Sequence, residues 1–348
     1  MGFRDLSTGQ LRREAPFLIA DAFRSNNHQP TPNNMLINSP TISPKQVGLA
    51  LIISIMAAEA IPMIARARSR ENFQHLRTAQ PSVIAQRNTI EVSPTGSVRT
   101  ITAALQQATS GTTIQLAPGT YGPSETFPLD LKEGVILKGN ESALGAGVVI
   151  TGGGRHLSRT YSNQNVVIVA HPNTEIIGVT VTNPNTRGTG IWVENADTIV
   201  RNSSFIDNNR EGIFAAGGAV PKIENNQFIN NKGNGVTLVG QSSGQVRGNV
   251  FDNTGFGVTV GKEAAPLIVS NQIKNNRAGI MINDQARPTL QDNTIENNKE
   301  YGIFVGKEAQ PNLLNNTFRS NGQDVYDQKT APPPPPLPPE PESLPPAP

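Results

Sequence analysis

The chain of 348 residues contains no cysteine, and this absence removes several classes of chemistry. It excludes disulfides, thiolate metal sites and a cysteine nucleophile, but it does not identify the compartment. Aromatic residues make up only 5% of the chain, and acidic and basic residues nearly cancel to a net charge of +2. A nucleic-acid-binding protein would carry a basic stripe with aromatic residues between the charges, so the composition argues against a nucleic-acid partner.

No hydrophobic run is long enough to span a bilayer comfortably. The longest, Val47–Ala58, is followed by the small residues Ala58-Glu59-Ala60, which resemble a signal-peptidase site. With translation starting at Met35, this segment would be an ordinary secretory signal. We therefore expect export to the periplasm, the cell surface or the medium. The alternative is that the run forms a buried helix.

The composition divides the chain into four parts. Residues 1–65 are a leader with the signal-like segment, 66–89 are a linker, 90–328 are a repeat domain, and 329–348 are a proline-rich tail. The tail must be extended and cannot build a core. It is interpreted as a solvated spacer, a wall-threading segment or a ligand for a proline-binding domain.

Three rows of residues recur with one period in the repeat domain. Asn-x-Phe/Ile elements, with Ser in place of Asn in the first, have their third residue 22 or 23 positions apart, at Phe205, Phe228, Phe251, Ile273, Ile295 and Phe318. Gly followed by an aliphatic residue recurs with the same spacing, the aliphatic residues being Ile191, Ile213, Val236, Val258, Ile280 and Ile303. A third row is Val200, Ile223, Val246, Ile268, Leu290 and Leu313. Such a period is typical of a solenoid.

The local patterns select the type of solenoid. Each repeat holds two or three short alternating apolar runs separated by Asn, Gly and Asp, without helical spacing or a leucine-rich-repeat frame. We predict an all-β fold, a right-handed single-stranded parallel β-helix with rungs about 4.8 Å apart. Equivalent residues of successive rungs should therefore be vertical neighbours, so that the three rows form aliphatic and aromatic ladders inside the tube.

Asparagine should form a ladder of its own. Its members align one rung apart: Ser203, Asn226, Asn249, Asn271, Asn293 and Asn316. Their amides can bond from rung to rung, and Asn also tolerates the left-handed turn conformation. Upstream, Val98–Ala108 places apolar residues on one helical face, and we expect it to cap the first rung.

The stretch Ile101–Glu141 contains an AL-x-x-A helix, TI-x-LAPGTY, FPL and GV-x-LKG. With these features, residues 90–328 resemble a bacterial β-helix family of unknown function, frequent in cyanobacteria. The resemblance implies the pectin-lyase-like superfamily fold and no particular reaction. The aspartate sets of the pectin methylesterases and polygalacturonases and the calcium site of the pectate lyases have no counterpart here.

Residues between two inward positions should point outward. The outward row beside the Gly-aliphatic elements is Trp192, Phe214, Thr237, Thr259, Met281 and Phe304. Exposed aromatic residues on a solenoid face can stack on sugar rings or form a protein interface. These are the candidate ligand-binding residues, and the alternative is that a linker or loop covers them.

The leading hypothesis is a non-catalytic protein of the cell envelope that binds polysaccharide or another surface component. The rival is a polysaccharide lyase, hydrolase or epimerase, whose catalytic candidates would be Glu194, Glu211, Arg187 and Arg210. No partner carboxylate of fixed spacing is visible for it. A third reading is a structural spacer. No histidine pattern indicates a metal site, and no cofactor is expected.

Overall fold

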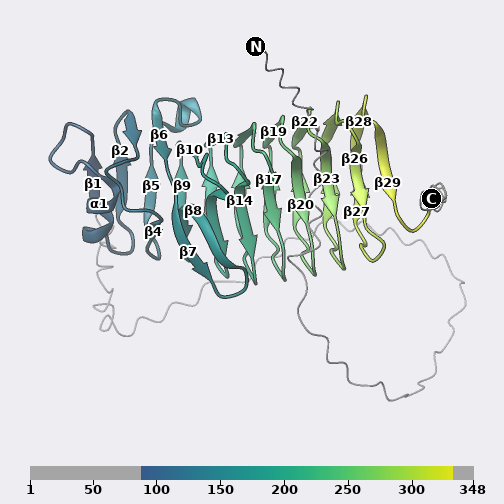
Figure 1. Cartoon of the computed structure of the whole chain (residues 1–348), viewed down its shortest axis with the longest axis horizontal. Helices are drawn as coiled ribbons and strands as arrows, with labels where there is room; N and C mark the ends of the chain where they lie inside the picture. Colours follow the sequence, from purple (N-terminus) through teal and green to yellow (C-terminus); the bar gives the residue numbers. More distant parts are fainter. Residues whose placement is uncertain (1–87, 332–348) are drawn as a thin grey trace, which may run out of the picture. The chain divides into compact units, whose positions relative to one another are not determined.

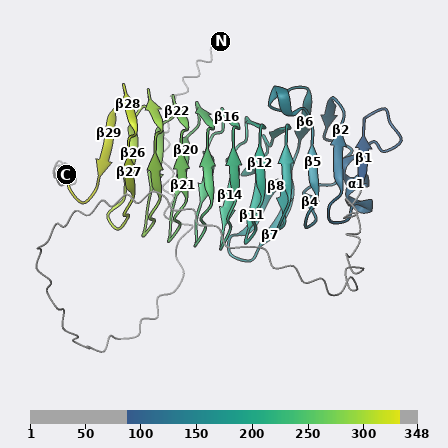
Figure 2. The ribbon, with the colours of Figure 1, turned by 180° about the vertical axis from the view of Figure 1, so that it is seen from behind.

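The computed structural model describes residues 88–331, and these residues form a parallel β-helix. Figures 1 and 2 show its rungs following one another from the first strand to the last. The predicted fold class is therefore confirmed. The signal-like segment and most of the proline-rich tail lie outside the described residues, so the predictions for them and the domain boundaries stay predictions.

Three sheets make the walls. The first, sheet A, runs through β1 (Thr89–Val92), β2 (Thr113–Leu116), β5 (Ile136–Lys138), β9 (Glu175–Ile177), β12 (Ile199–Arg201), β15 (Lys222–Glu224), β18 (Gln245–Arg247), β21 (Leu267–Val269), β24 (Thr289–Gln291) and β27 (Asn312–Leu314). Sheet B runs through β3 (Gly119–Tyr121), β6 (Val148–Thr151), β10 (Thr180–Thr182), β13 (Ser204–Ile206), β16 (Gln227–Ile229), β19 (Val250–Asp252), β22 (Gln272–Lys274), β25 (Thr294–Glu296) and β28 (Thr317–Arg319).

Sheet C carries the longest strands. They are β4 (Leu129–Leu131), β8 (Ser162–Ala170), β11 (Gly188–Glu194), β14 (Glu211–Ala216), β17 (Asn234–Leu238), β20 (Phe256–Val260), β23 (Ala278–Ile282), β26 (Tyr301–Val305) and β29 (Gln323–Asp327). One further strand, β7 (Gly154–Ser158), pairs antiparallel with β8 and makes a hairpin outside the regular coil. All other strand pairs of the described residues are parallel, as a single chain coiling in one direction requires.

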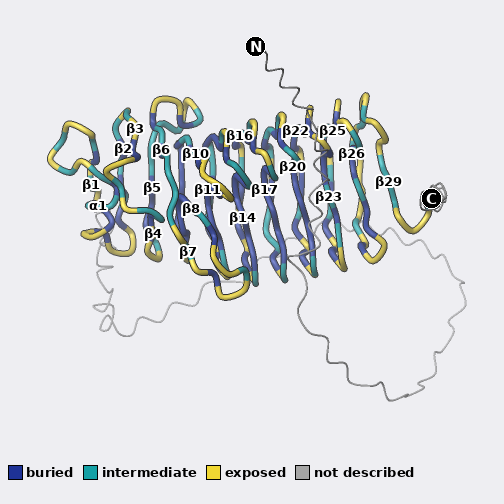
Figure 3. The backbone as a smooth tube through the Cα atoms, in the orientation of Figure 1, coloured by how far each residue is buried: buried dark blue, intermediate teal, exposed yellow. Residues whose placement is uncertain are grey.

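The predicted registers are confirmed by the strand pairs. Phe228 pairs with Phe251, and Val236 pairs with Val258. Inside the tube the rings of Phe205, Phe228 and Phe251 stack with centroids 4.9 and 4.7 Å apart. Figure 3 shows buried residues along the middle strands and exposed residues mainly at the turns. Burying each such side chain contributes roughly 1.5–3 kcal/mol, which makes the ladders the main source of stability.

The asparagine ladder is confirmed as well. The backbone N–H and side-chain amide of Asn271 donate to Oδ1 of Asn293 at 3.0 and 2.9 Å, and the same pattern links the neighbouring rungs. The left-handed conformation, however, belongs to the preceding position, which includes Asn225, Ser270 and Asp292. The ladder residues themselves have no left-handed backbone, and they lie in the short turn that joins each strand of sheet A to the next strand of sheet B.

A second row of polar residues lies in the turn after sheet B, where rung-to-rung hydrogen bonds join Asn208 to Asn231 and, further along, join Thr254, Asn276, Asn298 and Asn321. It ends at Asn208, whose buried Oδ1 has no hydrogen-bond partner.

A helix, α1 (Ile101–Gln107), lies next to the first strands and contacts β1, β2 and β4. It falls within the predicted segment, and it adds Ile101, Ala104 and Leu105 to the hydrophobic core. The Thr100 side chain accepts from the N–H of Ala103, and the Glu125 carboxylate accepts from the N–H groups of residues 101 and 102. These bonds satisfy the first amides of the helix. Among residues 88–331, no helix is long and apolar enough to cross a membrane.

Candidate functional site

The outward face of sheet C is the first candidate site. Trp192 pairs with Phe214, and the register then runs one rung further than the expected row, from Phe304 to Tyr326. The full row is Trp192, Phe214, Thr237, Thr259, Met281, Phe304 and Tyr326. Its two ends are aromatic, and its middle is polar or flexible.

The aromatic residues at the N-terminal end of this row are covered. Trp192 is 1% exposed and Phe214 is 4% exposed, and their rings stack with centroids 4.3 Å apart. Tyr161 lies against both rings, at 5.9 Å from Trp192 and 5.1 Å from Phe214. For this pair the alternative holds, in which a loop covers the outward rings. The β7–β8 hairpin covers the two rings and forms a small second core with them.

Burial shifts the pKa values of two side chains in the hairpin. Burial raises the pKa of Tyr161 to about 12, and the negative charge of Glu194 adds to the effect. Burial also lowers the pKa of His156, which lies 5.7 Å from the Trp192 ring and whose cationic form Glu194 partly stabilises. Both shifts favour the neutral side chain, which fits rings packed on an apolar surface.

The candidate catalytic acids have structural partners. Glu194 accepts hydrogen bonds from Trp192 Nε1 and Thr160 Oγ1, each at 3.1 Å. Glu211 is 2% exposed and accepts from Thr189 Oγ1 at 2.8 Å. The two acids lie in different rows of the face, because Glu194 pairs with Ala216 whereas Glu211 belongs to the start of β14.

The two candidate arginines differ. Arg210 Nε lies 2.8 Å from Glu211 Oε1, and the same guanidinium donates to Gln164 of the hairpin. Burial nevertheless raises the pKa of Glu211, and the positive charges of Arg210 and Arg187 only partly oppose this effect. Arg187 is exposed in a left-handed turn. Thus the structure brings Arg210 and Glu211 into contact, and Glu194 bonds to other groups.

The middle of the row satisfies its own hydrogen bonds. Asn234 donates to Thr237 Oγ1 at 2.8 Å, and Thr259 Oγ1 donates to Asn234 Oδ1 at 3.2 Å. Thr237 and Thr259 are also buried. Their expected role in ligand binding therefore has little support, since neither hydroxyl is presented to solvent.

The aromatic residues at the C-terminal end remain partly exposed. The rings of Phe304 and Tyr326 stack with centroids 5.5 Å apart, and Tyr301 lies 5.7 Å from Phe304 and 5.1 Å from Tyr326. We call Tyr301, Phe304 and Tyr326 the open aromatic patch. Tyr301 and Tyr326 were not identified from the sequence, although the period already places Tyr326 one rung after Phe304.

Charged and aromatic groups continue the patch toward the middle rungs. The Arg277 guanidinium lies 5.8 Å from the Phe256 ring centroid and also bonds to Glu300 at 2.8 Å. Phe256, Ala278 and Tyr301 occupy one row of the sheet. This side of the solenoid therefore presents flat rings beside hydrogen-bonding groups of both charges.

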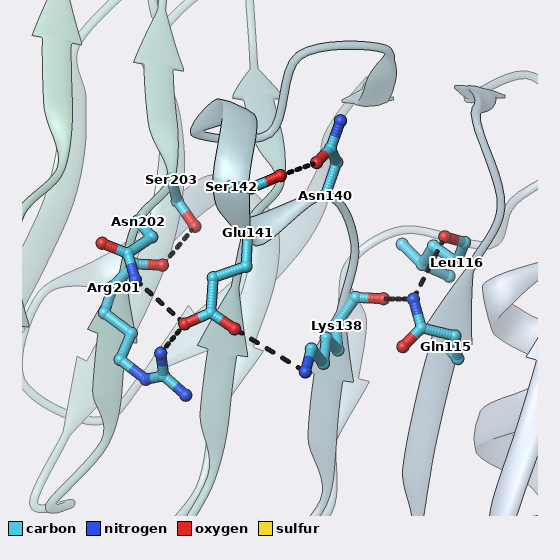
Figure 4. Close-up of polar contacts among 9 residues, drawn as sticks. All are labelled: Gln115, Leu116, Lys138, Asn140, Glu141, Ser142, Arg201, Asn202 and Ser203. Atoms are coloured by element: carbon cyan, nitrogen blue, oxygen red, sulfur yellow. Dashed lines mark hydrogen bonds and ion pairs between the residues drawn. The ribbon is translucent and has the colours of Figure 1, made fainter.

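A separate charged cluster lies near sheet A, and Figure 4 shows it. Glu141, in the short 3-10 helix η2 (Glu141–Ala143), contacts Arg201 Nη1, accepts from Asn202 Nδ2 at 3.0 Å and lies 3.6 Å from Lys138 Nζ. Its carboxylate thus holds the loop containing η2 against two rungs. It is a structural clamp, because its oxygens are occupied by these partners.

One shallow pocket of about 370 Å³ lies beside the first rungs of sheet B. Glu125 is the acidic residue that lines it, and its carboxylate already accepts hydrogen bonds from the first two N–H groups of α1. Within residues 88–331, no three His, Asp or Glu side chains gather in a way that could hold a metal ion. The described residues therefore offer the face of sheet C as the main candidate site.

Comparison with known families gives one clear match. The sequence model of the family described as "right handed beta helix region" matches residues 133–282 and 189–330, which together cover more than half of the chain. No curated protein matches the chain. The pairing of the strands agrees with the family, in which a single chain coils into stacked parallel rungs.

Several solved structures are similar at low identity. Pectate lyase Pel9A shares 14% identity over 71% of this chain and 82% of its own, with a TM-score of 0.45. The A-module of Azotobacter vinelandii mannuronan C-5 epimerase AlgE6 shares 15% over 65% of this chain and 90% of its own, with a TM-score of 0.35. The Yersinia enterocolitica family 28 exopolygalacturonase shares 12% over 69% and 78%, with a TM-score of 0.33. Likenesses this distant say nothing about the reaction.

Proposed function

The chain belongs to the right-handed β-helix family, and we propose that it is an exported, non-catalytic protein that binds polysaccharide through the open aromatic patch. The observation that carries the proposal is the cluster of Tyr301, Phe304 and Tyr326, three contacting and partly exposed rings on adjacent rungs. Partly exposed apolar clusters of this kind mark interaction sites on soluble proteins.

Sugar chemistry fits this surface. The carbon-bound hydrogens of a pyranose ring form an apolar face that stacks on an aromatic ring, while its hydroxyls need donors and acceptors at the rim. Two of the three rings are tyrosines, which combine a flat apolar body with a hydroxyl. Arg277 and Glu300 lie nearby and supply both a cation and a carboxylate. A polymer could therefore lie across successive rungs.

Binding is favoured over catalysis by the condition of the candidate acids. Hydrolysis by a carboxylate pair needs two groups about 5–9.5 Å apart that flank a bound sugar bond. Glu211 is buried against Thr189 and Arg210, and Glu194 bonds to the covered indole. Neither carboxylate is presented to a ligand on the open patch.

A glycan array followed by titration calorimetry tests the proposal. We expect micromolar or weaker polysaccharide binding by the wild-type chain and about a tenfold loss, or about 1.4 kcal/mol, for Tyr301→Ala and for Tyr326→Ala. Lys222→Ala, an exposed position on sheet A, is the matched control and should bind normally. Unchanged binding by both tyrosine variants would contradict the proposal.

The rival enzyme hypothesis has its own assay. Uronic-acid polymers would be incubated with the wild-type chain and with Glu194→Gln and Glu211→Gln, with unsaturated product and reducing ends as readouts. We expect no product from the wild-type chain. Product formation that either substitution abolishes would establish an enzyme instead.

A further inference from the structure

The pocket beside the first rungs lies at a corner of the solenoid that has lost its side chains. In the later rungs, the turn that joins sheet B to sheet C contains asparagines that bond from rung to rung. After β6, by contrast, the chain passes through Gly152 and Gly153 and continues into the β7–β8 hairpin. These two glycines and the turns that follow β3 and β10 line the pocket of about 370 Å³.

Close packing explains why this part of the chain is glycine. A Cβ atom on Gly152 would lie 2.3–2.8 Å from three carbons of the Phe127 ring, which is closer than Cβ contacts come. A Cβ atom on Gly153 would lie 2.3 Å from Asn165 Oδ1 and 2.7 Å from Asn183 Oδ1. The wall of the pocket is therefore an aromatic ring lying on bare backbone, with buried amide groups against the second glycine.

Both rims of the pocket are turns fixed by hydrogen bonds. In the turn after β3, the N–H of Glu125 donates to the carbonyl of Gly122 at 2.8 Å, and the Glu125 carboxylate is bonded to α1. In the turn after β10, the N–H of Gly188 donates to the carbonyl of Asn185 at 2.8 Å. Such groups are already ordered, so they lose little conformational freedom when a ligand binds.

One amide in the wall has an acceptor without a donor. Asn183 is fully buried, and its Oδ1 has no hydrogen-bond partner among the described residues. The nitrogen of the same amide donates to the carbonyls of Asn165 and Thr189 at 3.3 and 3.2 Å, which fixes the orientation of the group. A buried acceptor without a donor is costly. A hydroxyl donor at the adjacent glycine wall, acting directly or through a water, would satisfy it.

We propose that this pocket binds a single uncharged sugar ring, at a site separate from the open aromatic patch. Its volume falls near the lower end of the range for small-molecule sites, which suits one ring and not a long polymer. Phe127, Pro123 and Pro184 line it with apolar ring surfaces, against which the carbon-bound hydrogens of a sugar can pack. The proposal does not rest on polysaccharide binding at the patch.

The polar groups of the pocket select against an acidic sugar. Glu125 Oε1 accepts one hydrogen bond, from the N–H of Ile101, and Oε2 accepts two, from the N–H and hydroxyl of Thr102. A carboxylate has roughly four acceptor positions, so one remains on Oε1 for a sugar hydroxyl. Of the described residues that line the pocket, Glu125 alone is charged. A carboxylated sugar would meet this charge without a compensating cation.

Saturation-transfer NMR on the full chain tests the proposal, with methyl glycosides of several neutral hexoses and methyl glucuronide as probes. We expect at least one neutral glycoside to bind, and the glucuronide signal to be about tenfold weaker. Asn185→Trp, which puts a bulky side chain on the rim, should weaken the neutral signal about tenfold. Lys222→Trp adds the same bulk at an exposed position of sheet A and should have no effect.

Three results would overturn the proposal. The first is no signal from any neutral glycoside, and the second is an equal signal from the two tryptophan variants. The third is loss of the signal in Tyr301→Ala, which would place the sugar at the open aromatic patch and so support the proposed function while refuting this site.

A second variant tests the role of charge without touching the bonds of α1. Asn185→Lys places a cation on the rim beside the Glu125 carboxylate. The ratio of the glucuronide signal to the neutral signal should therefore rise about tenfold. An unchanged ratio would show that the charge of the pocket does not select the ligand, and the proposed preference for an uncharged ring would fall.

Discussion

The outward face of sheet C contains two stacked aromatic pairs in the same row, and they have different surroundings. Trp192 and Phe214 are 4.3 Å apart at an interplanar angle of 10°, and Phe304 and Tyr326 are 5.5 Å apart at 17°. The first pair is buried under the β7–β8 hairpin, whereas the second remains partly exposed. The repeat therefore sets the position and direction of a side chain, while an insertion outside the repeat decides its accessibility.

The largest expected difference between the two pairs is in stability. Trp192→Ala should lower the free energy of unfolding by about 3–5 kcal/mol, because it removes a fully buried ring and leaves a cavity under the hairpin. Phe304→Ala, in the open patch, should cost only about 0.5–1.5 kcal/mol, since the ring loses mainly its aromatic contacts. Urea unfolding measures both. Similar losses would show that the two ends of the row do not differ in burial.

The asparagine ladder allows the same comparison between a middle rung and an end rung. Asn271→Ala should cost about 1–3 kcal/mol, because it removes the bonds of the side-chain amide to Asn293 and to the Val246 carbonyl and leaves the donors of Asn249 without an acceptor. Asn316→Ala should cost less, since Asn316 is partly exposed and water can replace its bonds. Thermal melts of the two variants test this order. An Asn271→Ala melt indistinguishable from that of the wild type would refute the role of the ladder.

The buried carboxyl of Glu211 predicts that the stability of the folded chain depends on pH. Burial raises its pKa, so the folded chain binds this proton more tightly than the unfolded chain does. The stability that the protonated carboxyl contributes is present below the unfolded pKa and is lost as the pH rises through the folded pKa. Glu211→Gln has no charge to bury, so the melting temperature of this variant relative to wild type should increase as the pH rises above the ordinary glutamate pKa. A constant difference would mean that Arg210 fully compensates the burial.

The smallest effect is spectroscopic. Tyr161, on the hairpin, should ionise with a pKa of about 12. Titration of the phenolate absorbance should therefore show a late component that disappears in Tyr161→Phe, with little change in stability. If Tyr161→Phe removed an early component instead, the hairpin would not shield this ring in solution.

The regular part of this architecture was readable from the sequence, because each ladder needs the same residue type at the same spacing. The rows through Phe228, Val236 and Asn249 have the predicted neighbours. The hairpin was not predicted, because Gly154–Ser158 follows no period and its contacts with Trp192 are non-local. A signal was present, however. The inward residues of β6 and β10, Ile150 and Val181, are 31 residues apart, whereas Val181 and Phe205 are 24 apart.

The candidate site was only partly predictable for the same reason. The period identifies which residues face outward, and it places Phe304 and Tyr326 in one row. It cannot show that Glu194 bonds to an indole or that Glu211 loses its contact with solvent, because both depend on Thr160, Gln164 and Tyr161 of the insertion.

Trp192 is the only tryptophan in the chain, so its fluorescence reports directly whether the β7–β8 hairpin shields this ring from solvent. The decisive measurement is acrylamide quenching of this fluorescence, with and without a bound polysaccharide. We predict weak quenching in the free protein and no change when the polysaccharide binds at Tyr301 and Tyr326. Strong quenching in the free protein would contradict the covering of Trp192 by the hairpin. Protection of Trp192 by the polysaccharide would contradict the assignment of binding to the open aromatic patch alone.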